Sequence, residues 1–189
     1  MNLFGRSAAD GNRGFTIIEV LVVTAIIGVL AAIVFASFGT ARQQSRDKVR
    51  KSDLKQLQLA IEVYKSQHGM YPARGCSVSG TIWTAPPPTT GNSYVTQCSD
   101  YIQGLTPDYI PALPVDPNQG GADLGFEYLT NADRSAYKVV VHNTVEVNTI
   151  TSYADEFARC PRNCGSGTNC QATPQANVYA VYSAGAECW

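Results

Sequence analysis

One apolar run, from Phe15 to about Ala41, is long enough to cross a lipid bilayer, and it decides most of what this chain can fold into. A bilayer core needs about 20 consecutive apolar residues in a helix, so the run can span it. A single acid, Glu19, lies inside the run, and no further charge follows until Arg42. An ionised acid at the middle of such a helix costs roughly 2.5 to 3.5 kcal/mol on insertion scales. Glu19 is therefore a candidate functional residue.

The helix is expected to continue past the apolar run, because residues 43–68 contain no Gly or Pro and carry apolar residues at steps of three and four. Leu59 and Val63 fall on roughly the opposite side, where contact with a neighbouring subunit and ordinary exposure are both possible readings. Gly69 and Pro72 then predict a helix end at His68. The predicted face consists of Leu54, Leu57, Ile61 and Tyr64.

The remainder predicts a small α+β head over residues 69–189, in which the helix packs on an antiparallel sheet. Residues 69–125 are rich in Pro, Gly, Thr and Ser and predict a connecting loop region with one short helix at residues 101–105. Residues 126–189 are expected to form the sheet and a C-terminal loop. Strands are predicted at residues 125–129, 136–143 and 178–183, which are rich in Val, Tyr and Phe.

Charge is distributed unevenly along the chain. Residues 42–55 carry six Lys or Arg against two acids, whereas six Lys or Arg face eleven acids from residue 56 onward. An acidic head is a poor candidate for non-specific nucleic-acid binding, which depends on basic side chains that neutralise phosphates. The basic stretch from Arg42 to Lys55 is interpreted as a membrane-surface or inter-helix feature.

Six cysteines lie on the C-terminal side of the apolar run and are candidates for disulfides in an oxidising compartment. Fifteen pairings are possible for six cysteines; a Cys76–Cys98 bridge would close a loop worth ~3 kcal/mol, and Cys188 is expected to tether the C-terminal strand to residues 160–170. A zinc cluster of the last four cysteines is the alternative, and we expect no metal. The candidates are Cys76, Cys98, Cys160, Cys164, Cys170 and Cys188.

The two histidines, His68 and His142, have no recognisable nucleophile or acid partner in the sequence, and there is no Gly-rich phosphate loop. We therefore expect no catalysis, no catalytic residues and no cofactor.

Residues 1–19 resemble the class III signal of type IV prepilins and type II secretion pseudopilins: a polar leader, Gly14, then Phe-Thr-Ile-Ile-Glu opening an apolar helix. The resemblance implies a pilin fold, cleavage of the leader (residues 1–14) by a prepilin peptidase between Gly14 and Phe15, and N-methylation of Phe15. It implies that residues 15–41 form a transmembrane and assembly helix, continued by an amphipathic helix over residues 42–68. It further implies that Glu19 meets the amine of a neighbouring subunit during assembly; an acid that snorkels to the lipid headgroups is the alternative reading.

Two segments of the head resemble the major pseudopilin class of type II secretion. Residues 109–117 resemble the lead into its sheet, and residues 179–186 resemble its closing strand. That class usually carries an acidic calcium loop near the closing strand, but only Glu187 is close here, so calcium is unsupported by a loop of carboxylates. Pilins commonly carry a Pro late in the membrane segment, and residues 34–38 have none.

The positive-inside count favours a cytoplasmic location for the basic stretch, whereas the cysteines and the resemblance favour an external head. We expect the second orientation, in a single-pass inner-membrane protein that later enters an extracellular or periplasmic filament. The expected function is that of a filament subunit for secretion, adhesion, motility or DNA uptake, with itself, the peptidase, an inner-membrane assembly platform and membrane lipid as partners. The alternatives are a minor pilin acting as tip adhesin or receptor, and a plain single-span protein. The type II secretion pseudopilus and the type IV pilus both remain open.

Overall fold

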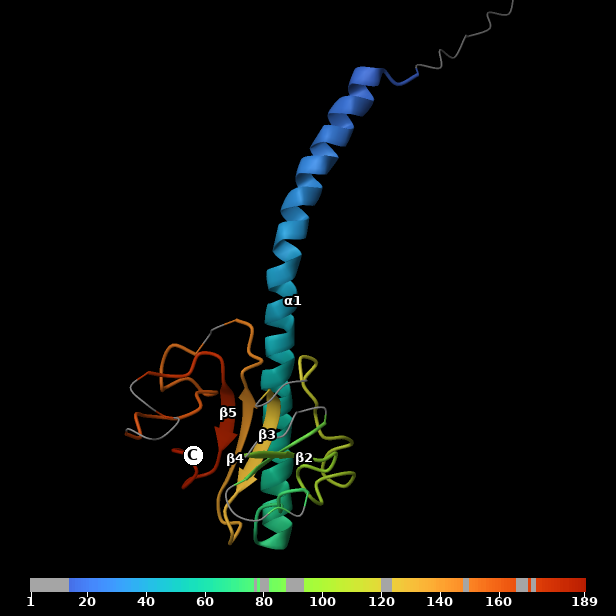
Figure 1. Cartoon of the computed structure of the whole chain (residues 1–189). Helices are drawn as coiled ribbons and strands as arrows, with labels where there is room; N and C mark the ends of the chain where they lie inside the picture. Colours follow the sequence, from blue (N-terminus) through green and yellow to red (C-terminus); the bar gives the residue numbers. More distant parts are fainter. Residues whose placement is uncertain are drawn as a thin grey trace, which may run out of the picture. The chain divides into compact units, whose positions relative to one another are not determined.

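The computed structural model describes residues 14–76, 78, 82–87, 94–119, 124–147, 150–165, 170 and 173–189, and at positions 36 and 37 only the backbone. The predicted leader, apart from Gly14, lies outside the described residues, as does part of the predicted connecting loop region. The chain divides into two compact units, one up to Arg42 and one from Gln43 onward. The second unit is the head (Figure 1).

A single helix, α1 (Ile17–His68, 52 residues), begins in the first unit and ends in the second. Its end at His68 confirms the prediction. Gly69 has φ of 76°, in the left-handed region that a C-terminal helix cap requires, and its amide donates to the Lys65 carbonyl at 2.8 Å. The next residues cannot continue the helix because Pro72 has no amide hydrogen to donate.

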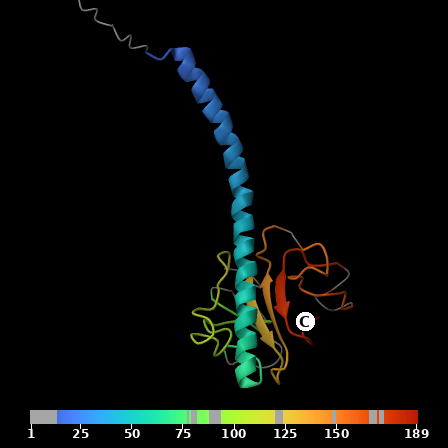
Figure 2. The same ribbon diagram turned by 180° about the vertical axis from the view of Figure 1, so that it is seen from behind.

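The predicted apolar face of α1 is the part that the head buries. Leu54, Leu57 and Ile61 are completely buried, and Tyr64 packs at the edge of the same core. Leu59 on the other side of the helix is 68% exposed. Figures 1 and 2 show the second half of α1 behind β3 in one view and in front of it in the other, so it covers one face of the sheet.

The sheet has five strands in the order β2-β1-β3-β4-β5. The three longer strands pair antiparallel, with Phe126 opposite Val141 and Val139 opposite Val181. β1 is antiparallel to β3, with Thr84 opposite Tyr128. The strands are β1 (Trp83–Ala85), β2 (Val95–Gln97), β3 (Gly125–Thr130), β4 (Tyr137–His142) and β5 (Tyr179–Tyr182).

Three details of the predicted head are corrected. The sheet is mixed, because β1 and β2 run parallel, and the connecting loop region supplies both of these strands. Each has only three residues, too few to show an alternating pattern. Residues 101–105 form turns in place of the predicted short helix, because Gly104 has φ of 72°, which an α-helix does not admit.

Alternation along β4 separates the two faces of the sheet. Tyr137, Val139 and Val141 belong to the main core that includes α1. Val140 belongs to a smaller apolar cluster on the other face, with Trp83 and Tyr182 packed against it. Lys138, on that second face, is completely buried, which the alternating pattern did not reveal.

Candidate functional site

The described N-terminal segment begins with an exposed apolar stretch. Phe15 is 83% exposed and Ile17 86%, and the large apolar side chains described up to Phe38 are exposed as well. By length and composition, α1 contains a segment able to cross a membrane, and none of that segment is buried by the protein itself. Because such a surface is unfavourable in water, it needs lipid or other chains to cover it.

Glu19 lies in the first turn of α1, where Thr16 caps the helix. The hydroxyl oxygen of Thr16 accepts a hydrogen bond from the Glu19 amide at 3.2 Å. Thr16 and Glu19 have the spacing of a capping box, a signal that is visible in the sequence, and the structure forms the half of it in which Thr16 accepts the Glu19 amide. The Glu19 carboxylate has no hydrogen bond or ion pair with any residue that the structure describes. It is therefore free to pair with a group outside the chain.

A second polar centre lies in the head, where the guanidinium of Arg50 contacts three carboxylates. Its Nε and Nη2 donate to the two oxygens of Asp116 at 2.6 and 3.0 Å. Its Nη1 donates to Asp47 at 2.7 Å and to Glu146 at 3.2 Å. The side chain of Arg50 is only 1% exposed, so its charge depends on these partners.

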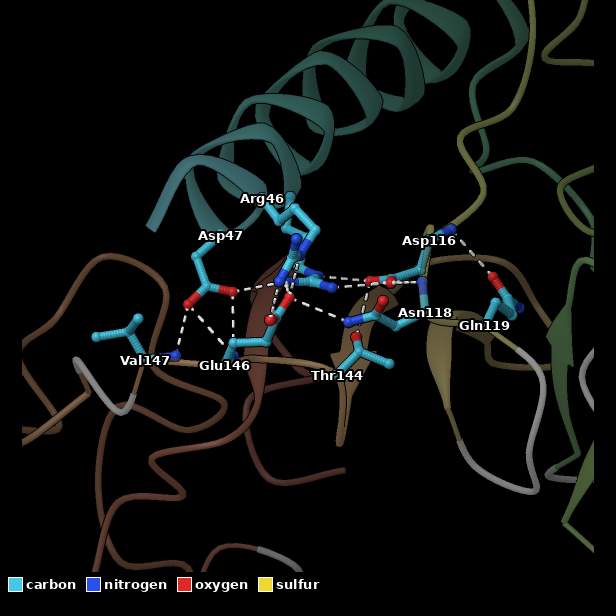
Figure 3. Close-up of polar contacts among 9 residues, drawn as sticks. Arg46, Asp47, Asp116, Asn118, Gln119, Thr144, Glu146 and Val147 are labelled. Atoms are coloured by element: carbon cyan, nitrogen blue, oxygen red, sulfur yellow. Dashed lines mark hydrogen bonds and ion pairs between the residues drawn. The ribbon is translucent and has the colours of Figure 1, made fainter. Parts of the chain in front are cut away.

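Asp47 and Asp116 also hold loops against the helix. Asp47 accepts the backbone amides of Glu146 at 3.1 Å and of Val147 at 2.8 Å. Asp116 accepts the Thr144 hydroxyl at 2.7 Å and the Asn118 amide at 2.8 Å. Figure 3 shows these groups converging beneath α1 from the loops before β3 and after β4. The cluster therefore joins three segments that are distant in the sequence.

Glu146 completes the cluster on its outer side. It accepts hydrogen bonds from Arg46 Nε at 2.6 Å and from Arg46 Nη2. The hydrogen bonds from Arg46, followed by those from Arg50, lower the pKa of Glu146 to about 2. Burial alone would lower the pKa of Arg50, but its hydrogen bonds and charge interaction with Asp116 raise it above its ordinary value. Glu146 and Arg50 are therefore both ionised at neutral pH.

These contacts correct the interpretation of the basic stretch. Arg46 and Arg50 are partners of acids in the same head, Lys55 pairs with Glu156 at 2.9 Å, and Lys51 lies 4.6 Å from the ring centre of Tyr179. The stretch is mainly an intramolecular contact of α1. Sequence reasoning missed Asp116 and Glu146 as partners of Arg50 because they lie far away in the sequence. Only Asp47, three residues before Arg50 on the same helix, was a local signal.

All six cysteines form disulfides: Cys76–Cys98, Cys160–Cys170 and Cys164–Cys188. The last pair tethers the segment after β5 to the 160–170 loop. The zinc alternative is thereby corrected, because a disulfide sulfur is not a thiolate ligand. Within the described part of the chain, no group of three or more His, Cys, Asp or Glu could hold a metal ion.

The histidines lie apart from these centres. His68 stacks on Tyr64 with ring centres 4.0 Å apart, near the exposed end of α1. The His142 ring lies 3.9 Å from the Glu127 carboxylate on the second face of the sheet.

Lys138 of β4 holds the C-terminal segment against the second face of the sheet. Its Nζ donates to the backbone oxygens of Glu187 and Trp189, both at 3.0 Å, and lies 4.9 Å from the Tyr182 ring centre. Loss of hydration in this buried position lowers the pKa of Lys138 to about 7, and the positive charge of Arg159 contributes to the shift.

Comparisons with known proteins agree with these features. Residues 10–35 match the family described as the prokaryotic N-terminal methylation motif. The chain is 35% identical to the type II secretion system core protein G of Klebsiella pneumoniae over 106 residues, which are 56% of this chain and 68% of that protein. It is 31% identical to the core protein G of Klebsiella michiganensis over 116 residues, 61% of this chain and 74% of that protein.

A shorter similarity links the chain to the type IV major pilin protein PilA of Myxococcus xanthus, with 42% identity over 60 residues, 32% of this chain and 27% of that protein. No solved structure matches. A methylation motif at the start of a long apolar helix, whose second half packs on a small sheet, defines a structural subunit of the pilin and pseudopilin class. Within that class, the chain belongs to the family of the type II secretion system core protein G.

Proposed function

We propose that this chain is a prepilin, cut between Gly14 and Phe15, N-methylated at Phe15 and polymerised through the first half of α1 into a filament. Glu19 carries this proposal, because its carboxylate has no partner in the described chain and lies four residues after Phe15 in an exposed apolar helix. Cleavage creates a positively charged amine at Phe15, with an ordinary pKa of about 7.7 to 8.0. Pairing Glu19 with the amine of a neighbouring subunit neutralises both groups in only one axial register.

The filament that we propose is a type II secretion pseudopilus. An alignment of 106 or 116 residues is about twice the length of α1 and must include part of the head, whereas the match to the type IV pilin has 60 residues, little more than the 52 of α1. The likeness of the head therefore favours the core protein G system over the pilus.

The proposed topology has an inner-membrane helix and an external head before assembly, with the peptidase and an inner-membrane assembly platform as partners. The three disulfides support the external location, because disulfides persist in oxidising compartments.

The Glu19→Gln variant separates the proposed pairing of Glu19 with a neighbouring Phe15 amine from the contribution of Glu19 to the helix cap. Glutamine preserves the capping-box pattern but removes the charge. We expect normal membrane insertion and cleavage, shown by mass spectrometry of an N-terminus at methylated Phe15, together with a loss of most filament in sheared fractions. Thr16→Ala is the matched control: it removes the cap, leaves the charge, and is expected to assemble.

Wild-type filament yield from Glu19→Gln would refute the pairing. An uncut chain would refute the prepilin assignment as a whole. The alternative of a tip adhesin or receptor predicts immunogold label at filament ends alone, whereas label along the whole length supports the proposed role.

A further inference from the structure

The head contains a cavity of about 560 Å³ on the side of the sheet where β1 meets the β3–β4 turn and the C-terminal segment. This volume lies within the roughly 300 to 1,000 Å³ of typical small-molecule sites. Neither the polar cluster of Arg50 nor the N-terminal segment contributes to it. Its lining includes Arg74, Trp83, Leu129, Thr130, Asn131 and Trp189.

Both tryptophans of the chain line this one cavity. Trp83 comes from β1 and Trp189 from the segment that Lys138 and the Cys164–Cys188 bridge hold in place. Both side chains are only half-buried, so part of each ring faces the opening. With Leu129 between β1 and the turn, they form an apolar wall that an apolar ligand group would cover.

Arg74 is the charged group of the cavity. Its backbone is held by a bridge to Ile102, and its Nη1 donates to the Ile82 carbonyl at 2.9 Å. Among the residues that the structure describes, no carboxylate lies within ion-pair distance of Arg74, and its other donors have no hydrogen-bond partner. Burial lowers the pKa of Arg74, a shift that a bound anion would offset.

The side chains of Thr130 and Asn131, two further polar groups of the lining, already have partners. The Thr130 hydroxyl donates to the Ala136 carbonyl at 2.8 Å, and the Asn131 side chain bonds both Ser135 and the Ala136 amide within the β3–β4 turn. A peptide would bring several backbone amides and carbonyls, more polar groups than the two indole N–H donors of this wall can pair. A ligand with one anionic group and an otherwise apolar body fits what remains.

We propose that this cavity binds a small apolar monocarboxylic acid, with the carboxylate on the Arg74 guanidinium and the apolar body against Trp83, Trp189 and Leu129. The planar fork of arginine donors matches a carboxylate.

Tryptophan fluorescence tests the proposal on the full chain in detergent, because the signal arises from the two cavity residues alone. The probe is 3-phenylpropionate, excited at a wavelength where it does not absorb, and the matched neutral probe is 3-phenylpropionamide. We expect a saturable change with the acid and at least about tenfold weaker binding of the amide, as the loss of a charge-assisted pair predicts.

Arg74→Gln should weaken binding of the acid by about tenfold or more, since glutamine keeps a hydrogen-bond donor but carries no charge. Arg162→Gln removes the same charge from an exposed position outside the cavity lining and should leave the affinity unchanged. Thermal melting of each variant checks that the fold is retained.

The proposal is overturned by equal binding of acid and amide, by the absence of a saturable signal, or by unchanged affinity in a folded Arg74→Gln chain. It is also overturned if a short peptide ending in phenylalanine binds more tightly than the free acid, since the cavity would then receive a polypeptide C-terminus.

Discussion

Arg50 of α1 and Asp116 of the loop before β3 form a buried ion pair with two parallel hydrogen bonds, of 2.6 and 3.0 Å, across 66 residues of sequence. The two side chains are 1% and 0% exposed. Asp116 also accepts hydrogen bonds from Asn118 in its own loop and from Thr144 in the loop after β4. The pair therefore connects the helix to both of these loops. The second half of α1 is thus attached to the head by a specific polar contact as well as by apolar packing.

Arg50→Met is expected to destabilise the head strongly. The substitution leaves Asp47, Asp116 and Glu146 without their shared counterion, and breaking a buried pair in this way costs roughly 3 to 5 kcal/mol. Urea unfolding of a chain that begins at Gln43 measures the change. Lys48→Met, on the exposed side of the same helix, is the control and should stay within about 0.5 kcal/mol of the parent. Equal effects of both variants would contradict the role of the pair.

Stability in acid should depend on Glu146. Its pKa falls from the ordinary 4.5 to about 2 in the folded head, so the unfolded chain takes up the proton more readily. The resulting stabilisation is complete above pH 4.5 and is lost as the pH falls toward about 2. Glu146→Gln should flatten this part of the curve of unfolding free energy against pH. A mutant curve as steep as that of the parent would show that other groups control the acid transition.

Lys138 should give a pH dependence in the alkaline range. Burial lowers its pKa from 10.5 to about 7, so folding disfavours its charged form. The unfolded chain holds more protons between these values, and stability must rise as the pH rises from about 7 to 10.5. Lys138→Met should abolish the rise, whatever it does to absolute stability by releasing the backbone oxygens of Glu187 and Trp189. Unfolding midpoints measured across this range decide the question; a persistent rise in the mutant argues against Lys138.

The stability lost when a disulfide is removed should increase with the length of the loop that the disulfide closes. The Cys76–Cys98 and Cys164–Cys188 bridges join residues that are 22 and 24 positions apart in the sequence, whereas Cys160 and Cys170 are 10 positions apart. In the chain-entropy model the longer loops contribute ~3 kcal/mol and exceed the short one by about 0.7 kcal/mol. Paired Cys→Ser variants, compared by thermal melting, test this order. Reductant should lower the melting temperature of the parent; six free thiols in the native external protein would refute the bridges themselves.

Much of the fold was accessible from local patterns. The helix end at His68 follows from Gly69 and Pro72, and the buried face of Leu54, Leu57 and Ile61 follows from a period that only a helix produces. The three longer strands were found because each is a run of β-branched and aromatic residues. The short β1 and β2 were missed, since three residues show no period and their pairing is decided by neighbours.

The two polar centres also differ in how much of each can be inferred from the sequence. The motif of Gly14, Phe15 and Glu19 is contiguous, so the apolar run with its single acid could be inferred from the residues alone, and the expected cleavage point follows from their resemblance to the prepilin signal. The partners of Arg50, the disulfide connectivity, the burial of Lys138 and the cavity beside Arg74 depend on segments brought together from distant positions. Only the tertiary structure decides such contacts, because the sheet register and the packing of α1 determine which side chains lose water together.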